Sequence, residues 1–262
     1  MEIVGHVSGK ALLEGLSAVE EIVSLGIGVE VQLTSELLDT FTYKEFGILK
    51  DKVRGRALTV HAPFLDLNPG AFDSYVLDAT RQRFLEAVSV AKVLEAKVIV
   101  FHTGFHPLKV APYYQVWFKR AIETFKMVAE EFDGKIALEN VFDTNPENLK
   151  KFLKELPPKV GVCIDTGHLN LFSEVPLSEW IGTFKDRIYE FHLHDNYGKK
   201  DEHAPLDSGN FNFEELFNLL EIVNSEYIFN LENKAVSDVR ESLDALRRFK
   251  WKGKLESTPM RS

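Results

Sequence analysis

Short apolar runs alternate with longer amphipathic segments along the whole chain. The short runs are rich in Val and Ile, which is typical of buried parallel strands. The longer segments repeat apolar residues at the three- and four-residue spacing of a helix. This alternation indicates βαβ units around a parallel sheet. We predict strands at Ile3–Val7, Val29–Leu33, Leu58–His61, Val98–His102, Lys135–Glu139, Val160–Asp165, Ile188–His194 and Tyr227–Leu231.

Eight strand–helix units fit a closed (β/α)8 TIM barrel better than an open doubly wound sheet. A barrel of this kind needs about 250 residues, and the chain has 262. Because we find no linker or change of composition, we predict one domain over residues 1–255 and a loose tail over 256–262. The predicted helices are Leu12–Leu25, the weaker Thr42–Val53, Arg81–Leu94, Tyr113–Phe132, Pro146–Leu156, Leu177–Phe184, Phe213–Val223 and Val236–Phe249.

Composition narrows the class of protein. Hydrophobic residues make up 45% of the chain, which is enough for a large buried core. The net charge of −9 disfavours nonspecific attraction to DNA. Cys163 is the only cysteine, so an intrachain disulfide is excluded and a reducing compartment fits. The sequence shows neither a signal-peptide pattern nor an apolar run of membrane-spanning length. We therefore expect a soluble cytoplasmic protein without a membrane partner.

Six consecutive predicted strands end in residues that bind metals or transfer protons. In a barrel the carboxyl ends of the strands converge on one rim, where catalytic residues gather. Carboxylate oxygens and neutral imidazole nitrogens together suit Mn, Zn, Fe or Co, and a cation would relieve the repulsion between crowded carboxylates. The rim is therefore predicted to bind a divalent metal. The residues that carry this prediction are His61, His102, Glu139, Asp165, His168, His192, His194 and Glu232.

Each of these residues, taken alone, has a plainer interpretation. A single strand-end histidine is more often a hydrogen-bonded structural residue than a ligand. Asp165-Thr166 could start a turn, and Asp201-Glu202-His203 could be solvated loop charge. Only their joint placement favours a metal site. Because side chains alternate along a strand, His192 and His194 point the same way, and either can be the ligand from strand seven.

Together these motifs resemble the xylose isomerase-like barrel superfamily. It includes isomerases and epimerases of sugars and sugar phosphates, as well as endonuclease IV, the abasic-site DNA repair enzyme of AP endonuclease family 2. The most specific segment is Val160–His168, followed by His192–Asp195 with Asp201–His203. The resemblance extends from the first predicted strand to the last.

The isomerase branch of the superfamily implies one metal ion, held by Glu139, Asp165, His192 and Glu232. In that branch the two glutamates also form the acid–base pair that moves a proton between neighbouring sugar carbons, and we add His168 as a third catalytic residue. The substrate would be a sugar, a sugar phosphate or a related polyol ketone. Relatives of this kind are often homo-oligomers. The residues expected to contact the substrate are His61, His102, His194 and Phe64.

The endonuclease branch is the alternative, with abasic-site DNA as its substrate and three zinc ions. Taken together, the two branches imply that the protein binds one to three divalent ions, which can be Mn, Zn, Co or Mg. The segments Val141–Pro146, Leu206–Gly209 and Thr34–Asp39 depart from the endonuclease pattern. Phe64-Leu65 could mimic a DNA-wedging pair, although we prefer a hydrophobic wall for a small substrate. Lys109 could recognise a phosphate. The zinc ligands implied are His61, His102, Glu139, Asp165, His168, His192, Asp201, His203 and Glu232.

Overall fold

Eight parallel strands form a closed barrel in the computed structural model, which describes residues 2–110 and 113–249. Each strand pairs with the next, and β8 pairs with β1. The predicted (β/α)8 TIM barrel is thus confirmed, whereas the predicted tail at 256–262 lies outside the described residues. The strands are β1 (Glu2–Val7), β2 (Gly28–Gln32), β3 (Leu58–His61), β4 (Val98–His102), β5 (Lys135–Glu139), β6 (Val160–Asp165), β7 (Ile188–Leu193) and β8 (Ile228–Leu231).

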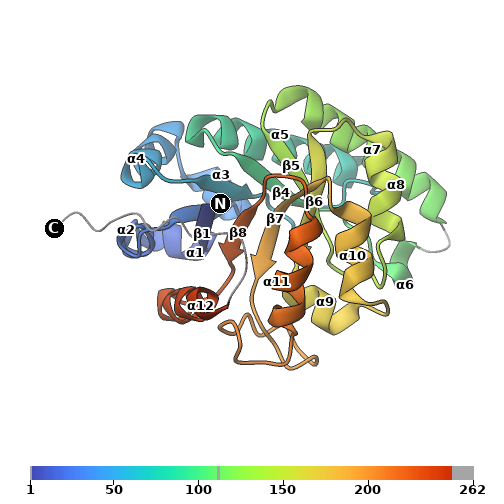
Figure 1. The fold of residues 1–262 in the computed structure, drawn as a ribbon. Coiled ribbons are helices and arrows are strands. Elements are labelled where there is room, and N and C mark those ends of the chain that lie inside the picture. The colour runs from blue at the N-terminus through green and yellow to red at the C-terminus, as the bar shows by residue number, and fades with distance from the viewer. Residues whose placement is uncertain (1, 111–112, 250–262) are drawn as a thin grey trace.

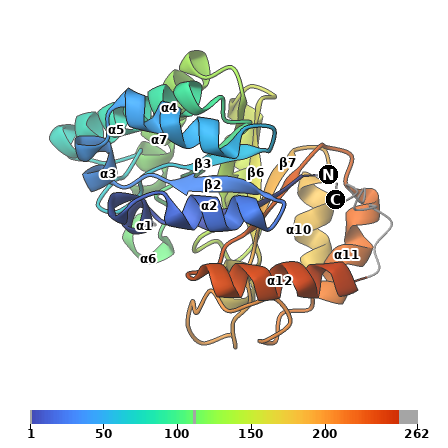
Figure 2. The same ribbon diagram turned by 90° about the vertical axis from the view of Figure 1, so that its left-hand side faces the viewer.

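Helices surround the barrel (Figure 1). In Figure 2, α2 and α12 run side by side across one flank, so the first and last parts of the described chain pack together. The helices are α1 (Gly9–Glu14), α2 (Ser17–Ser24), α3 (Ser35–Thr40), α4 (Tyr43–Val53), α5 (Ser74–Leu94), α6 (Pro107–Val110), α7 (Tyr114–Glu131), α8 (Glu147–Glu155), α9 (Thr166–Phe172), α10 (Leu177–Phe184), α11 (Phe213–Leu219), the 3-10 helix η2 (Leu220–Ile222) and α12 (Val236–Arg248).

Local chemistry explains where the helices differ from the predicted ones. The first predicted helix is two helices, because Gly15 adopts a φ of 130° between them. Helix α5 begins well before the predicted Arg81, since Asp73 caps it by accepting hydrogen bonds from the backbone N–H groups of Tyr75 and Val76. Asp165 starts a short helix, α9, where a turn was the plain interpretation.

The apolar core has two parts. The larger part lies between the strands and the helices. The smaller part fills the barrel interior toward the amino ends of the strands, with side chains such as Val4, Val100 and Cys163. Toward the carboxyl ends of the strands the interior is polar instead, so the ionisable side chains gather at that rim. Within the described residues, every helix is too short or too polar to cross a membrane.

Candidate metal centre

A cavity of about 640 Å³ opens at the carboxyl ends of the strands. Its floor is made of ionisable side chains and its walls are largely aromatic. Three of the predicted site residues, Asp165, His192 and His194, are fully buried beneath the floor. The predicted residues that line the cavity are His61, Phe64, His102, Glu139, His168, Asp201, His203 and Glu232, and two further aromatic residues, Phe105 and Phe142, complete its walls.

Four of the predicted ligands converge beneath this floor. Nδ1 of His192 lies 3.1 Å from Oε2 of Glu232, 3.8 Å from Oε2 of Glu139 and 3.9 Å from Oδ2 of Asp165. Two ligands that share one ion at 2.1 Å in a tetrahedron are about 3.4 Å apart. The three carboxylate oxygens therefore lie at distances from this nitrogen that suit ligands sharing one divalent ion.

Glu139 also contacts two histidines that end the strands β3 and β4. Its Oε2 atom lies 3.2 Å from Nε2 of His61 and 3.2 Å from Nε2 of His102. Phe64 stacks on the His102 ring at a centroid distance of 4.3 Å, so an aromatic wall stands directly beside this group. His61, His102 and Glu139 make a second cluster with metal-ligand spacing.

A third cluster lies where the loop after β7 returns to the rim. Asp201 Oδ2 lies 3.0 Å from Nε2 of His203 and 3.6 Å from Nε2 of His168. The rings of His203 and His194 stack at a centroid distance of 4.1 Å. Asp201, His203 and His194 have metal-ligand spacing. The loop residues Asp201 and His203 therefore lie beside the strand-end residues of the rim.

The backbone around His194 explains why this ring is buried. A Cβ atom at Gly167 would lie 1.9 Å from the His194 ring, so only glycine permits this approach. Nε2 of His194 lies 3.0 Å from Oδ2 of Asp165. Because His194 is absent from the cavity wall, its position favours a ligand or positioning role over the substrate contact predicted for it.

The buried polar atoms of the rim fit a divalent cation. Several lack an aligned hydrogen bond within the described residues: both ring nitrogens of His192, Nδ1 of His194, Oδ1 of Asp201 and Oε2 of Glu232. Leaving such atoms unsatisfied is costly, and all of them belong to predicted ligands. Nitrogen and oxygen donors in this mixture suit Zn or Mn.

The histidines and carboxylates of the rim shift one another's pKa values. Burial would raise the pKa values of Glu139 and Glu232, but nearby histidines outweigh burial and hold both well below their usual range. Burial would lower the pKa of His203, but Asp201 and Glu232 raise it to about 9. Because metal ligands must be deprotonated, metal binding here would release protons.

Sequence reasoning missed a polar layer inside the barrel, one layer below the metal cluster. Glu30 and Glu190 lie two residues before Gln32 and His192 on their strands, so they point into the barrel. Both are fully buried. Burial and the charge of Glu30 raise the pKa of Glu190 well above its usual value, which favours the protonated form. An acidic residue between apolar neighbours in a strand, as at Glu30, was the signal available.

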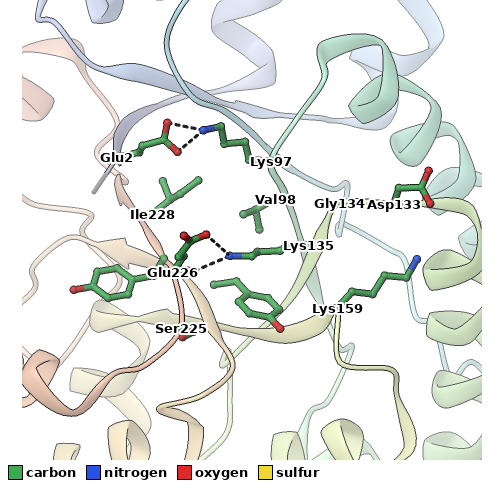
Figure 3. Close-up of a pocket in the computed structure, with 12 residues that line it drawn as sticks. Glu2, Lys97, Val98, Asp133, Gly134, Lys135, Lys159, Ser225, Glu226 and Ile228 are labelled. Carbon is green, nitrogen blue, oxygen red and sulfur yellow. Dashed lines mark hydrogen bonds and ion pairs between the residues drawn. The ribbon is translucent and has the colours of Figure 1, made fainter.

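The opposite end of the barrel holds a cavity of about 700 Å³ with different chemistry (Figure 3). All three lysines that line it are paired. Nζ of Lys97 donates to both carboxylate oxygens of Glu2 at 2.6 and 2.7 Å, while Lys135 and Lys159 donate to the backbone oxygens of Glu226 and Phe132. This cavity lacks buried unsatisfied polar atoms among the described residues. The rim cavity is therefore the better candidate for the functional site.

Comparison with other sequences identifies related proteins. The chain is 30% identical over 203 residues to an uncharacterised protein of Methanocaldococcus jannaschii, a match covering 73% of this chain and 69% of that protein. It is 29% identical over 185 residues to a Mycoplasmoides gallisepticum protein named "Probable endonuclease 4", covering 63% of this chain and 60% of that one.

Solved structures extend the likeness over almost the whole chain. A D-tagatose 3-epimerase-like protein superposes with a TM-score of 0.81 at 28% identity, covering 94% of this chain and 96% of that one. A Thermus thermophilus protein soaked with ZnCl2 superposes with a TM-score of 0.76 at 25% identity, covering 94% and 97%. A family profile described as xylose isomerase-like TIM barrel matches residues 28–249. The chain therefore belongs to the xylose isomerase-like TIM barrel family.

Proposed function

We propose that the protein is a metal-dependent epimerase or isomerase of an uncharged sugar. The observation that carries the proposal is the convergence of Glu139, Asp165 and Glu232 on one nitrogen of His192. Both glutamates also line the cavity, so they reach the space that a substrate would enter. The likeness to a D-tagatose 3-epimerase-like protein supports the same reaction class.

The two glutamates would carry the proton. A bound divalent ion supplies polarisation of the substrate carbonyl, which acidifies the neighbouring C–H group. Glu139 ends β5 and Glu232 follows β8, so the carboxylates approach the cavity from strands well separated around the barrel. Their low pKa values keep both ionised at neutral pH. One would remove the proton, and the other would return it to the opposite face or to the neighbouring carbon.

His168 would hold the acid–base residue in place. Its Nδ1 atom lies 3.0 Å from Oε1 of Glu139, while Nε2 faces Asp201 at 3.6 Å. Burial would lower the pKa of His168, but the carboxylates around it raise the pKa well above its usual value. The carboxylates around His168 therefore favour its protonated form beside Glu139.

The cavity wall favours an uncharged substrate over a sugar phosphate. Lysine and arginine are absent from the wall among the described side chains, and the side chain of Lys109 lies outside them. Phe64, Phe105 and Phe142 offer apolar faces against which the C–H face of a sugar can pack. The amides of Gln32 and Asn68 also line the cavity, where they can bind hydroxyl groups.

A zinc phosphodiesterase is the second candidate. The presence of several overlapping groups with metal-ligand spacing, rather than one, favours it, because such enzymes activate water with several ions. The match to a protein named "Probable endonuclease 4" is consistent with this candidate. The lack of lysine and arginine in the described cavity wall argues against it, since a DNA backbone is bound mainly through these side chains.

A substrate panel separates the two candidates. Chelator-treated protein is reloaded with Mn, Co or Zn and incubated with D-tagatose, D-fructose, the corresponding sugar phosphates and an abasic-site duplex. We expect a new epimer or isomer from a free sugar and an intact duplex. Cleavage of the duplex without conversion of any sugar would refute the proposal.

A further inference from the structure

We infer that Glu30 is a positioning residue that orients His192 for metal binding. The inference rests on the proposed metal centre and names a residue outside the predicted ligand set. Oε2 of Glu30 lies 3.3 Å from Nε2 of His192. The other nitrogen of the same ring, Nδ1, faces Glu139, Asp165 and Glu232. The imidazole therefore lies between the carboxylate of Glu30 on its Nε2 side and the three other carboxylates on its Nδ1 side.

Glu30 is itself fixed by its second oxygen. Oε1 accepts a hydrogen bond from Nδ2 of Asn230 at 2.6 Å and lies 2.9 Å from Nδ1 of His6. Asn230 belongs to β8 and His6 to β1, so three strands hold this carboxylate in the barrel interior. Oε2 lacks an aligned hydrogen bond among the described residues, which leaves it directed at His192.

The chemistry of a metal-binding histidine explains the need for such a partner. A neutral imidazole has one N–H group and one lone pair, and only the lone pair binds a metal. A carboxylate beside Nε2 places the proton there, leaves the lone pair on Nδ1 and makes that nitrogen more basic. Neither nitrogen of His192 makes an aligned hydrogen bond within the part of the chain that the structure describes. An ion at Nδ1 and a proton at Nε2 would satisfy both.

Glu190 supplies a matched control from the same layer. It is as deeply buried as Glu30, but its Oε1 accepts a hydrogen bond from Thr59 Oγ1 at 3.0 Å. Glu30→Gln and Glu190→Gln therefore make the same chemical change at neighbouring buried sites. Only the first removes the carboxylate that lies 3.3 Å from His192; Glu190 has an oxygen within 4.8 Å of the same ring but makes no ion pair with it within 4.0 Å among the described residues.

Calorimetric titration of chelator-treated protein with Mn or Zn tests the inference without any substrate. Loss of a partner of this kind typically weakens metal binding about 10- to 100-fold, and we expect that loss for Glu30→Gln. Glu190→Gln should weaken metal binding much less, because Glu190 makes no ion pair with His192 among the described residues whereas Glu30 lies 3.3 Å from it. Unchanged affinity in Glu30→Gln, or equal losses in both variants, would overturn the inference.

A second measurement needs no variant and therefore does not depend on its folding. Nitrogen NMR of ¹⁵N-histidine-labelled, zinc-loaded wild type reports which ring nitrogen of His192 carries the proton. We expect zinc on Nδ1 and the proton on Nε2; zinc on Nε2 would refute the role of Glu30. Metal binding without sugar turnover would refute only the proposed reaction, whereas a wild type that binds none of these ions would overturn the metal centre and this inference together.

Discussion

Asp143 is a buried carboxylic acid beside the rim, and replacing it with asparagine should stabilise the protein most at alkaline pH. Its Oδ1 accepts a hydrogen bond from Nδ2 of Asn148, in the first turn of α8, at 2.9 Å. Oδ2 is buried without an aligned partner among the described residues. Burial raises the pKa of Asp143 from 3.8 to about 7. The folded state therefore prefers the neutral acid, which asparagine imitates.

The sign of the effect follows from proton binding. The folded protein keeps the Asp143 proton up to about pH 7, whereas the unfolded chain releases it near pH 4. Between these values the folded state binds more protons, so stability falls as the pH rises. We take acid pH, where Asp143 is protonated in both states, as the reference. At about 1.36 kcal/mol per pKa unit, its ionisation lowers the free energy of unfolding by roughly 1.7 kcal/mol at pH 5 and 4.3 kcal/mol at pH 8. The advantage of the variant should therefore grow by about 2.6 kcal/mol between these pH values.

Urea unfolding followed by circular dichroism measures this difference. Wild type, Asp143→Asn and a control at an exposed position, Asp78→Asn, are compared at pH 5 and pH 8 after treatment with chelator. Comparing the variant with the wild type at each pH cancels the titration of other groups. A gain of equal size at both pH values, or a loss that deepens at pH 8, would refute the reasoning.

Two further predictions concern the glutamates at the rim. Glu232→Gln should fold normally but lose turnover, because the amide cannot accept the substrate proton; circular dichroism and a sugar-conversion assay check this, and full activity would argue against a catalytic role. Glu139→Ala should lower the metal content of the purified protein, since Glu139 lies within 3.2 Å of His61, His102 and His168. Elemental analysis measures that content, and undiminished metal would count against ligation.

The pattern of the sequence predicted the barrel because each strand carries its own signal. Runs such as Val98–His102 and Lys135–Glu139 appear in the structure with unchanged bounds. Helix ends were harder to predict, because they depend on single residues. Asp73 extends α5 backwards through its cap, and Gly15 divides a helix that periodicity alone would join.

The residues that gather at the rim were also predictable, because the barrel brings strand ends together. The buried polar layer below the rim, which contains Glu30 and Glu190, could not be predicted from the sequence. Glu30 belongs to an apolar strand, and its partners His6, Asn230 and His192 are distant in the sequence. Only strand register places them side by side. Whether His192 or His194 faces the three carboxylates likewise depends on ring orientation, which alternation along one strand does not determine.

In the proposed reaction, a metal ion and the paired glutamates at the rim move a proton on a sugar carbon. The most direct measurement is solvent exchange: wild type loaded with Mn or Co is incubated with D-tagatose or D-fructose in D2O, and the recovered sugars are examined by NMR and mass spectrometry. We predict deuterium at the carbon next to the ketone, lost when Glu232 is replaced by Gln. Protein of proven metal content that leaves both sugars free of deuterium would contradict the account.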